Sequence, residues 1–418
     1  MTERKSFKMN KLLKTVIAGV SALTMCISAM PLSASAATTS YKKGDVNGDG
    51  VVNSVDVLEC KKFLLGKVSA DGATFERLDT NKNFIVDNVD YQTIRNINLG
   101  LENSVQITST NTDGSSDYNT YVQYELTYNK FNAVNGSKIE QYTIPAVSKI
   151  STSSPRSGII NGDDRVIDYN QSSVVVLTNG TKVIGTGFIV DSDKIVTAAH
   201  VLYDTESNVA QNNIKYILFN SKGQKIDING NVVSNQNSYM GISADSYHIP
   251  EYYVRASDYG ESGGNGDALA HGFYQDYALI KVNQDLSKYQ SLNVGMVRNG
   301  IKNVASTQEL FVTGYNTDNK TTSDVNGANS QLLGKIVTGS GHLCSFPLNS
   351  VYMLSRTNLF YDVDVLSGES GGPIYIKNDD GSKTVIGINT GMNRSGCYNQ
   401  GTRFDTKILT FMFNNPKF

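Results

Sequence analysis

The sequence predicts two folded regions of different class, a small helical domain near the amino terminus and an all-β domain in the carboxyl-terminal part. Two observations lead to this prediction. A twelve-residue pattern rich in Asp and Asn occurs twice, at 45–56 and again at 79–90. Beyond residue 158, short apolar runs alternate with turn residues, and helical periodicity is nearly absent until the last dozen residues. The 418 residues are enough for two or three domains.

The composition excludes several classes of protein. A hydrophobic content of 39% argues against intrinsic disorder. Basic residues number 37 against 39 acidic ones, so the chain has no excess of positive charge for binding nucleic acid. We therefore expect a globular protein with no nucleic-acid partner.

Residues 1–36 form a predicted signal peptide. A basic start, KMNKLLK, precedes the apolar run TVIAGVSALTMCISAM, and Ala34 and Ala36 give the small-residue pattern of a cleavage site. The apolar run is too short and wrongly flanked for a good membrane span, with a retained anchor as the alternative. We expect a secreted chain without membrane contact after cleavage. Its loss removes five basic residues and one acidic residue, which leaves 32 against 38 and a formal charge of −6.

Each twelve-residue segment has the composition of a calcium-binding loop. Positions 1, 3, 5, 9 and 12 carry Asp or Asn in both copies, and the carbonyl of position 7 completes a set of oxygen ligands of the kind that calcium prefers. The expected ligands of the first loop are Asp45, Asn47, Asp49, the Val51 carbonyl, Asn53 and Asp56. Those of the second loop are Asp79, Asn81, Asn83, the Ile85 carbonyl, Asp87 and Asp90. We expect two Ca²⁺ ions, one in each loop.

A predicted helix follows each loop and ends at a glycine, Gly66 in the first copy and Gly100 in the second. The 34-residue offset also suits helical repeats, but those need at least three copies. The first loop has Gly50 at its sharp turn, whereas the second has Phe84, for which a left-handed backbone would cost about 1 to 2 kcal/mol. We therefore expect the second site to bind calcium more weakly. Cys60, on the first helix, is expected to be a buried small hydrophobe.

No helix precedes the first loop, so each copy is half of an EF-hand. This duplicated F-hand resembles the type I dockerin module over residues 41–103. The resemblance implies a calcium-dependent partner, the cohesin domain of a cellulosomal scaffoldin. The positions that read the cohesin in that family correspond here to Ser54, Val55, Lys61 and Lys62, and to Asn88, Val89, Arg95 and Asn96. The two sets differ, which argues against symmetric dual-mode binding; a solvated helix face is the alternative for each residue.

Residues 104–157 form a polar connector rich in Ser, Thr, Asn and Tyr. Two runs within it, YVQYELTY and KIEQYTI, predict a strand pair. The composition fits a linker or a propeptide and does not choose between them.

Residues 158–418 have the pattern of an antiparallel barrel or sandwich. The apolar runs are SSVVVL, GTGFIV, KIVTAAH, YALIKV, LFVTGY, GGPIYI and TVIGINTG, with turn residues between them. This tract is therefore predicted to be all-β.

Three residues of this tract have the types that acyl transfer needs. His200 ends a predicted strand, Asp276 precedes another, and Ser370 lies in GESGGP, where glycines allow a tight turn. A serine hydroxyl becomes a nucleophile when an imidazole takes its proton and a buried carboxylate orients the imidazole. The substitutes for the carboxylate are Asp258 and Asp267, and the histidines expected on the surface or in packing are His248 and His271.

The motifs TAAH, DYALIKV and GESGGP, with the late strand VIGINTG, resemble the chymotrypsin-fold serine peptidases, in that family's order of His, Asp and Ser. INGDDR, VTGY and YNQGTR place the resemblance nearest the bacterial glutamyl endopeptidases. It implies a double six-stranded β-barrel and endopeptidase activity on protein or peptides without a catalytic cofactor. It also implies that the N–H groups of Gly368 and Ser370 hold the oxyanion.

Two other functions stay open. A catalytically silent module of the same fold, displayed on the cellulosome, is the alternative to an enzyme. Calcium control of the peptidase within the same chain is a third idea.

The specificity positions depart from the family pattern. Glutamyl endopeptidases hold their acidic residue partly with a histidine where this chain has Asn389, which argues against acidic specificity. Asp364, six residues before Ser370, corresponds to the pocket-base aspartate of trypsin-like relatives, and this favours a basic residue unless Asp364 points away from the pocket. Cys344 and Cys397 would flank the pocket, and a disulfide between them is left open.

Relatives are often made as zymogens. SPRSGIINGDDR offers Arg156 as a cleavage point upstream of Ile159 and Ile160. A freed amine would then pair with Glu369, and the cut would release the peptidase from its scaffold. Activation and release would be one event.

Overall fold

The computed structural model describes most of the chain beyond its first 37 residues, and the predicted signal peptide lies outside the described part. The described residues are 38–68, 70, 72–83, 85–110, 123–147, 163–205, 207–234, 240–254, 276–289, 292–297, 309–317, 330–343, 358–391, 399–413 and 415. The chain divides into two compact units, and the larger comprises Tyr41–Ile107 and Ser116–Phe418. None of the described helices is long and apolar enough to cross a membrane.

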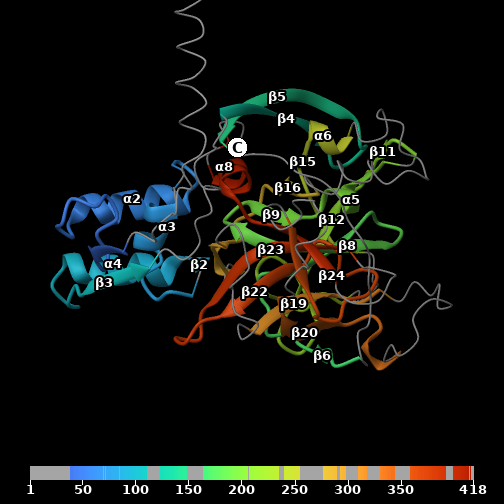
Figure 1. The fold of residues 1–418 in the computed structure, drawn as a ribbon. Helices are drawn as coiled ribbons and strands as arrows, with labels where there is room; N and C mark the ends of the chain where they lie inside the picture. The colour runs from blue at the N-terminus through green and yellow to red at the C-terminus, as the bar shows by residue number, and fades with distance from the viewer. Residues whose placement is uncertain are drawn as a thin grey trace, which may run out of the picture. The chain divides into compact units, whose positions relative to one another are not determined.

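A helical region follows the amino-terminal strand of the described chain. Helices α2 (Ser54–Leu64) and α4 (Asn88–Asn98) follow the two predicted loops and pack against each other (Figure 1). Each begins with a capping box, in which the side chain of Asn53 or Asp87 accepts a backbone N–H of the first turn. The helix after each loop is therefore confirmed. The sequence did not predict α3 (Gly72–Leu78), which lies between the repeats.

Apolar side chains from all three helices form a small core. Cys60, Phe63, Leu78 and Ile94 are among its buried members, and the rings of Phe63 and Phe75 meet edge to face. Cys60 is fully buried, as predicted. Strands β1 (Thr38–Lys42) and β3 (Gln106–Thr110) pair to form a separate two-stranded sheet.

Two large sheets, antiparallel but for one short parallel pair, form the rest of the larger unit, which confirms the β-rich prediction (Figure 1). The first sheet has ten strands in the order β13 (Lys225–Ile226), β12 (Lys215–Phe219), β7 (Val174–Thr178), β8 (Val183–Asp191), β9 (Lys194–Thr197), β16 (Ala278–Lys281), β15 (Ser246–Pro250), β4 (Gln123–Asn132) and β5 (Lys138–Val147), with β14 (Ile242–Ser243) on β12. The second has eight, in the order β21 (Asn358–Tyr361), β24 (Asn399–Arg403), β23 (Lys383–Gly391), β22 (Pro373–Lys377), β19 (Glu309–Tyr315), β20 (Ile336–His342) and β6 (Val166–Ile167), with β17 (Asn293–Val294) parallel to β23.

Short elements connect and edge these sheets. The helices are α5 (Ala199–Leu202), α6 (Glu251–Val254) and α8 (Thr406–Phe413), with 3₁₀ turns η3 (Ser287–Tyr289) and η4 (Ser330–Leu332). The remaining strand pairs are β10 (Tyr203–Asp204) with β11 (Val209–Ala210), and β18 (Met296–Val297) with β2 (Ile85–Val86).

The connector contributes two strands to the first sheet. The predicted strand pair exists as β4 and β5, and β4 also pairs with β15 over five residues. Tyr128 of β4 is fully buried, and its ring stacks on that of Phe411 with centroids 4.3 Å apart. The hydroxyls of Tyr128 and Tyr277 are hydrogen-bonded at 3.0 Å. The hairpin is thus part of the first sheet, and Tyr128 belongs to the core of the β region.

The helical region and the β region also share contacts. Strand β2 of the second loop pairs with β18, with Val86 opposite Met296. Gly66 follows the end of α2, and its carbonyl accepts the hydroxyl of Thr410, on α8, at 2.8 Å. A Cβ on Gly66 would lie 2.6 Å from the Thr410 nitrogen, so this approach requires glycine.

The packing of the hairpin predicts a large stability effect. Replacing Tyr128 by Ala removes a fully buried aromatic ring and should lower the free energy of unfolding by about 3 to 5 kcal/mol. Thr143→Ala, on the exposed side of β5, is the matched control and should change it by less than about 1 kcal/mol. Denaturant unfolding of the purified chain measures both. Equal effects of the two variants would mean that the hairpin is not part of the folded core.

Candidate active site

The structure brings His200 and Asp276 together. His200 lies in α5, directly after β9, and Asp276 precedes β16, which pairs with β9. The His200 Nδ1 atom lies 2.7 Å from Asp276 Oδ2, and the His200 backbone N–H donates to Oδ1 at 2.9 Å. Asp276 is 1% exposed, whereas the His200 side chain is about one-third exposed. A buried carboxylate that accepts the Nδ1 proton leaves Nε2 free of a proton and able to accept one.

Ser370 lies in a tight turn between β21 and β22. Gly368 and Gly371, on either side of it, have φ values of +95° and +87°, a conformation that side chains with a Cβ rarely adopt. A Cβ on Gly371 would lie 2.1 Å from the Thr186 carbonyl and from the Thr197 hydroxyl. The turn therefore packs closely against β8 and the end of β9, two strands of the other sheet.

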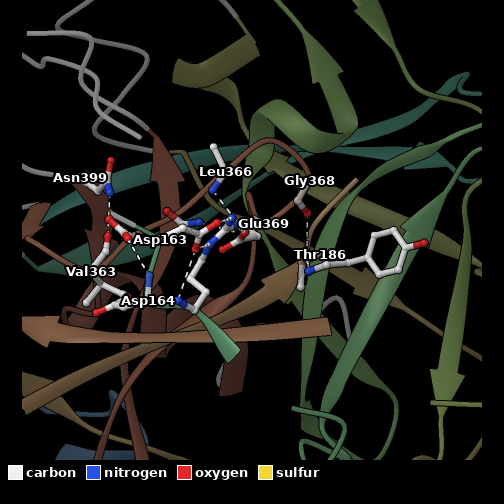
Figure 2. Close-up of polar contacts among 12 residues, drawn as sticks. Asp163, Asp164, Thr186, Val363, Leu366, Gly368, Glu369 and Asn399 are labelled. Atoms are coloured by element: carbon white, nitrogen blue, oxygen red, sulfur yellow. Dashed lines mark hydrogen bonds and ion pairs between the residues drawn. The ribbon is translucent and has the colours of Figure 1, made fainter. Parts of the chain in front are cut away.

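Thr186 of β8 holds this turn in place. Its backbone N–H donates to the Ser370 carbonyl at 2.8 Å, and its hydroxyl donates to the Gly368 carbonyl at 2.7 Å (Figure 2). The same hydroxyl accepts the N–H of Tyr315 at 2.8 Å. One threonine thus fixes two carbonyls of the reactive turn from the sheet that carries His200.

The turn leaves two backbone donors available. The N–H groups of Glu369, Gly371 and Gly372 donate to carbonyls within the protein, at 3.1, 2.7 and 3.0 Å. No acceptor among the described residues takes the N–H groups of Gly368 and Ser370. These are the two groups expected to hold an oxyanion.

A buried charge cluster lies behind the turn. The Arg165 guanidinium forms ion pairs with Glu369, beside Ser370, and with Asp163, and all three side chains are at most 2% exposed. Sequence reasoning assigned Glu369 to a freed amine and overlooked Arg165, although Arg165 is part of the quoted INGDDR motif.

The two positions predicted to set specificity, Asn389 and Asp364, are buried and hydrogen-bonded within the protein. The amide of Asn389 donates to the Glu369 carbonyl at 3.0 Å and accepts the Tyr361 hydroxyl at 2.8 Å. The Asp364 carboxylate accepts the backbone N–H of Asp164 at 3.4 Å (Figure 2).

Several sequence predictions fall on residues outside the described part of the chain. These are the substitute carboxylates Asp258 and Asp267, the histidine His271, the cleavage region with Arg156, Ile159 and Ile160, the cysteines Cys344 and Cys397, and Phe84.

In the first calcium-type loop, two carboxylates accept backbone N–H groups of the same loop. Asp45 accepts the N–H groups of Gly48 and Gly50, both at 2.9 Å, and Asp56 accepts those of Asn47 and Asn53 at 3.1 and 2.9 Å. Asp45 and Asp56 are buried. Within the described chain, no three His, Cys, Asp or Glu side chains cluster closely enough for a metal. The predicted donor set of this loop also includes Asn side chains and a carbonyl oxygen. That mixture suits calcium.

The second loop has three Asp residues, as the first loop does. Asp79, Asp87 and Asp90 are all buried, and burial raises the pKa of Asp90 to about 7, with Asp87 and Asp79 adding to the shift. A divalent cation would relieve this repulsion, so the residues fit the ion. Lys82, at the fourth position, has a φ of +61° where the first loop has Gly48, so the second loop holds strain that we did not predict.

Asp87 has a further partner outside its own loop. The hydroxyl of Thr384, on β23, donates to the Asp87 carboxylate. The expected calcium ligand at position 9 therefore also contacts the β region.

The cohesin-reading positions of the first repeat are more exposed than those of the second. Ser54, Val55 and Lys61 are exposed, whereas only Arg95 is exposed in the second set.

Comparisons with known proteins agree with this division. Residues 185–388 match the model of a trypsin-like peptidase domain, and residues 43–117 match that of a dockerin type I domain. A solved structure described as a Glu endopeptidase in complex with MPD is similar, with a TM-score of 0.41 and 18% identity, over 61% of this chain and 97% of that one. No curated protein sequence matches the chain.

His248 is a packing histidine, as expected, and it gives a pH prediction. Burial, with the charges of Lys130 and Lys281, lowers the pKa of His248 from 6.5 to about 3. The unfolded chain therefore binds this proton more readily, so stability is full above pH 6.5 and falls as the pH drops toward 3, by up to about 1.4 kcal/mol per unit. His248→Gln should flatten this slope, as measured by denaturant unfolding at several pH values. The exposed His342→Gln should leave it unchanged, and equal slopes in wild type and His248→Gln would contradict the assignment.

Proposed function

The chain carries a type I dockerin domain and a trypsin-like peptidase domain, and from this combination we propose a secreted serine endopeptidase that a scaffoldin holds through a cohesin. The catalytic part of the proposal rests on the hydrogen bond of 2.7 Å between His200 and the buried Asp276. The expected substrate is protein or peptide, at a site with no cofactor.

Ser370, His200 and Asp276 are assigned the roles of a catalytic triad. Ser370 attacks the scissile carbonyl while His200 Nε2 takes its proton and later returns it to the leaving amine. Asp276 holds the ring in the Nδ1–H tautomer and stabilises the imidazolium that forms. The N–H groups of Gly368 and Ser370 receive the oxyanion, where each donor is worth about 2.7 to 4 kcal/mol.

The contacts of the specificity residues favour neither charged side chain. Asn389 uses its amide on Glu369 and Tyr361, and the Asp364 carboxylate is bonded to the backbone of Asp164. Cleavage of a peptide library shows the residue preference directly.

The dockerin gives the chain its proposed location. Type I dockerins bind calcium, and we assign one Ca²⁺ to each loop, held by the side chains and carbonyls predicted above. Bound calcium would offset the loop carboxylates and order the start of α2 and α4, the helices that face a cohesin. The chain would then reside outside the cell, on a cellulosome or the cell surface.

One observation supports calcium control of the peptidase as a second function. Thr384, on a strand of the peptidase region, donates to the calcium-loop residue Asp87. The silent-module alternative gains no such support, and the hydrogen bond between His200 and Asp276 is one that a catalytic triad needs.

The catalytic assignment predicts a selective loss of reactivity. A fluorophosphonate should label Ser370 in wild type and not in Ser370→Ala, and Asp276→Asn should lower kcat by about 10⁴-fold because the ring takes the wrong tautomer. Mass spectrometry of the labelled peptide and peptide hydrolysis measure these effects. Ser367→Ala is a matched control in the same turn and should still be labelled. Absence of labelling in wild type would favour the silent module.

The dockerin assignment predicts calcium-dependent binding. Chelation, or Asp45→Ala together with Asp79→Ala, should abolish capture by a panel of purified cohesins, because position 1 of each loop loses its carboxylate. Asp379→Ala, in an exposed turn of the β region, serves as a binding control. Peptidase activity is measured on the same samples. Activity that survives chelation supports docking alone, whereas activity lost with cohesin binding supports calcium control in cis.

A further inference from the structure

A fully buried cation lies behind the reactive turn, and the assigned triad does not use it. The Arg165 side chain is 0% exposed and pairs through Nη1 with Glu369 Oε1. Its Nη2 lies 2.8 Å from Asp163 Oδ2, and its Nε donates to Oδ1 at 2.8 Å. A buried guanidinium is costly unless it is fully paired, and replacing such pairs with apolar residues often costs nothing. A role beyond stability is therefore worth testing.

Glu369 joins this cation to the reactive turn. Its Oε1 also accepts the backbone N–H of Leu366 at 3.2 Å (Figure 2), and its carbonyl accepts the N–H of Gly372 at 3.0 Å. Glu369 thus fixes both ends of the turn that carries the two oxyanion donors. A Cβ on Gly314 would lie 2.6 Å from the Glu369 Cβ, so the β19 backbone leaves this side chain no room to move away.

Arg165 holds its place through the chain next to it. Asp163 binds its guanidinium and its backbone N–H, and Asp164 is tied to the Asp364 carboxylate. Strand β6, which starts at Val166, pairs with β20. None of these contacts needs a free amino terminus.

The charges of Arg165 and Glu369 each stabilise the other. Burial raises the pKa of Glu369 to about 7, and the Arg165 guanidinium opposes that shift. Burial lowers the pKa of Arg165, but Asp163 and Glu369 together raise it above its usual value.

We propose that Arg165 is a positioning residue that holds the oxyanion turn through Glu369, in the place of the freed amine of an activated zymogen. The inference rests on the proposed peptidase function. It separates activation from release: the peptidase is competent while it is still joined to its dockerin. This revises the expectation that a cut after Arg156 supplies the partner of Glu369.

Variants at Arg165 test the positioning role. Arg165→Met should lower kcat about 100-fold or more with little change in KM, because the turn loses its oxyanion geometry rather than its substrate contacts. Arg165→Lys should retain part of the activity. Guanidinium ion below denaturing concentrations should restore part of the kcat of Arg165→Ala, a rescue that a merely structural role would not give. Lys194→Met, which removes a partly exposed ion pair with Asp191 in the same region, should change kcat less than about 3-fold.

The state of the amino terminus tests the second half of the inference. Intact mass of fluorophosphonate-labelled protein should show labelled chains that still contain the dockerin, and Arg156→Gln should be as active as wild type. Labelling confined to chains that begin between residues 157 and 162 overturns the inference, as does full activity in Arg165→Met, and either leaves the proposed peptidase intact. A wild-type chain that hydrolyses no peptide in cut or uncut form overturns both.

Discussion

The alignment of the site depends on the contact between Thr186 and the reactive turn. His200 follows a strand of one sheet and Ser370 precedes a strand of the other, so no single strand pairing sets the distance between them. Thr186 bonds the carbonyls of Gly368 and Ser370 directly, and its own carbonyl accepts the hydroxyl of Thr197, three residues before His200. Because Gly371 has no Cβ, the turn approaches these two threonines closely enough for the bonds to form. The glycines of the motif thus serve the junction between the sheets as much as the turn itself.

Buried charge is used twice around this junction, in two different ways. Asp276 is satisfied by hydrogen bonds from His200, whose ring remains about one-third exposed to a substrate. Glu369 is paired through Oε1 with Arg165, and both side chains are closed off from solvent. The first arrangement leaves a group free to exchange protons, and the second fixes a conformation. Burying a carboxylate costs free energy at either place, so each one needs a hydrogen-bond donor in a fixed orientation.

The sequence was informative wherever chemistry requires residue types at fixed spacing. Oxygen side chains at five loop positions and the His, Asp and Ser motifs predicted the helical region and the β class. The structure brings His200 and Asp276 together, and the role of Ser370 stays a prediction. Contacts between distant segments were not predictable in this way. Arg165 and Glu369 are 204 residues apart, and nothing in their local sequence links them. The hairpin of the connector reads as polar because β5 is largely exposed on one side, although Tyr128 and Tyr142 are buried. Helix α3 lacks a long amphipathic pattern because it has only seven residues.

The two dockerin repeats are used unequally. The second repeat contacts the β region through β2 and through Asp87, so part of its surface is occupied within the chain. The cohesin-reading positions at the start of α2 remain exposed, whereas Asn88 and Val89, next to Asp87, are partly covered. The first repeat therefore exposes more of these positions than the second, which contacts the β region, so the difference in sequence between the two sets has a structural counterpart.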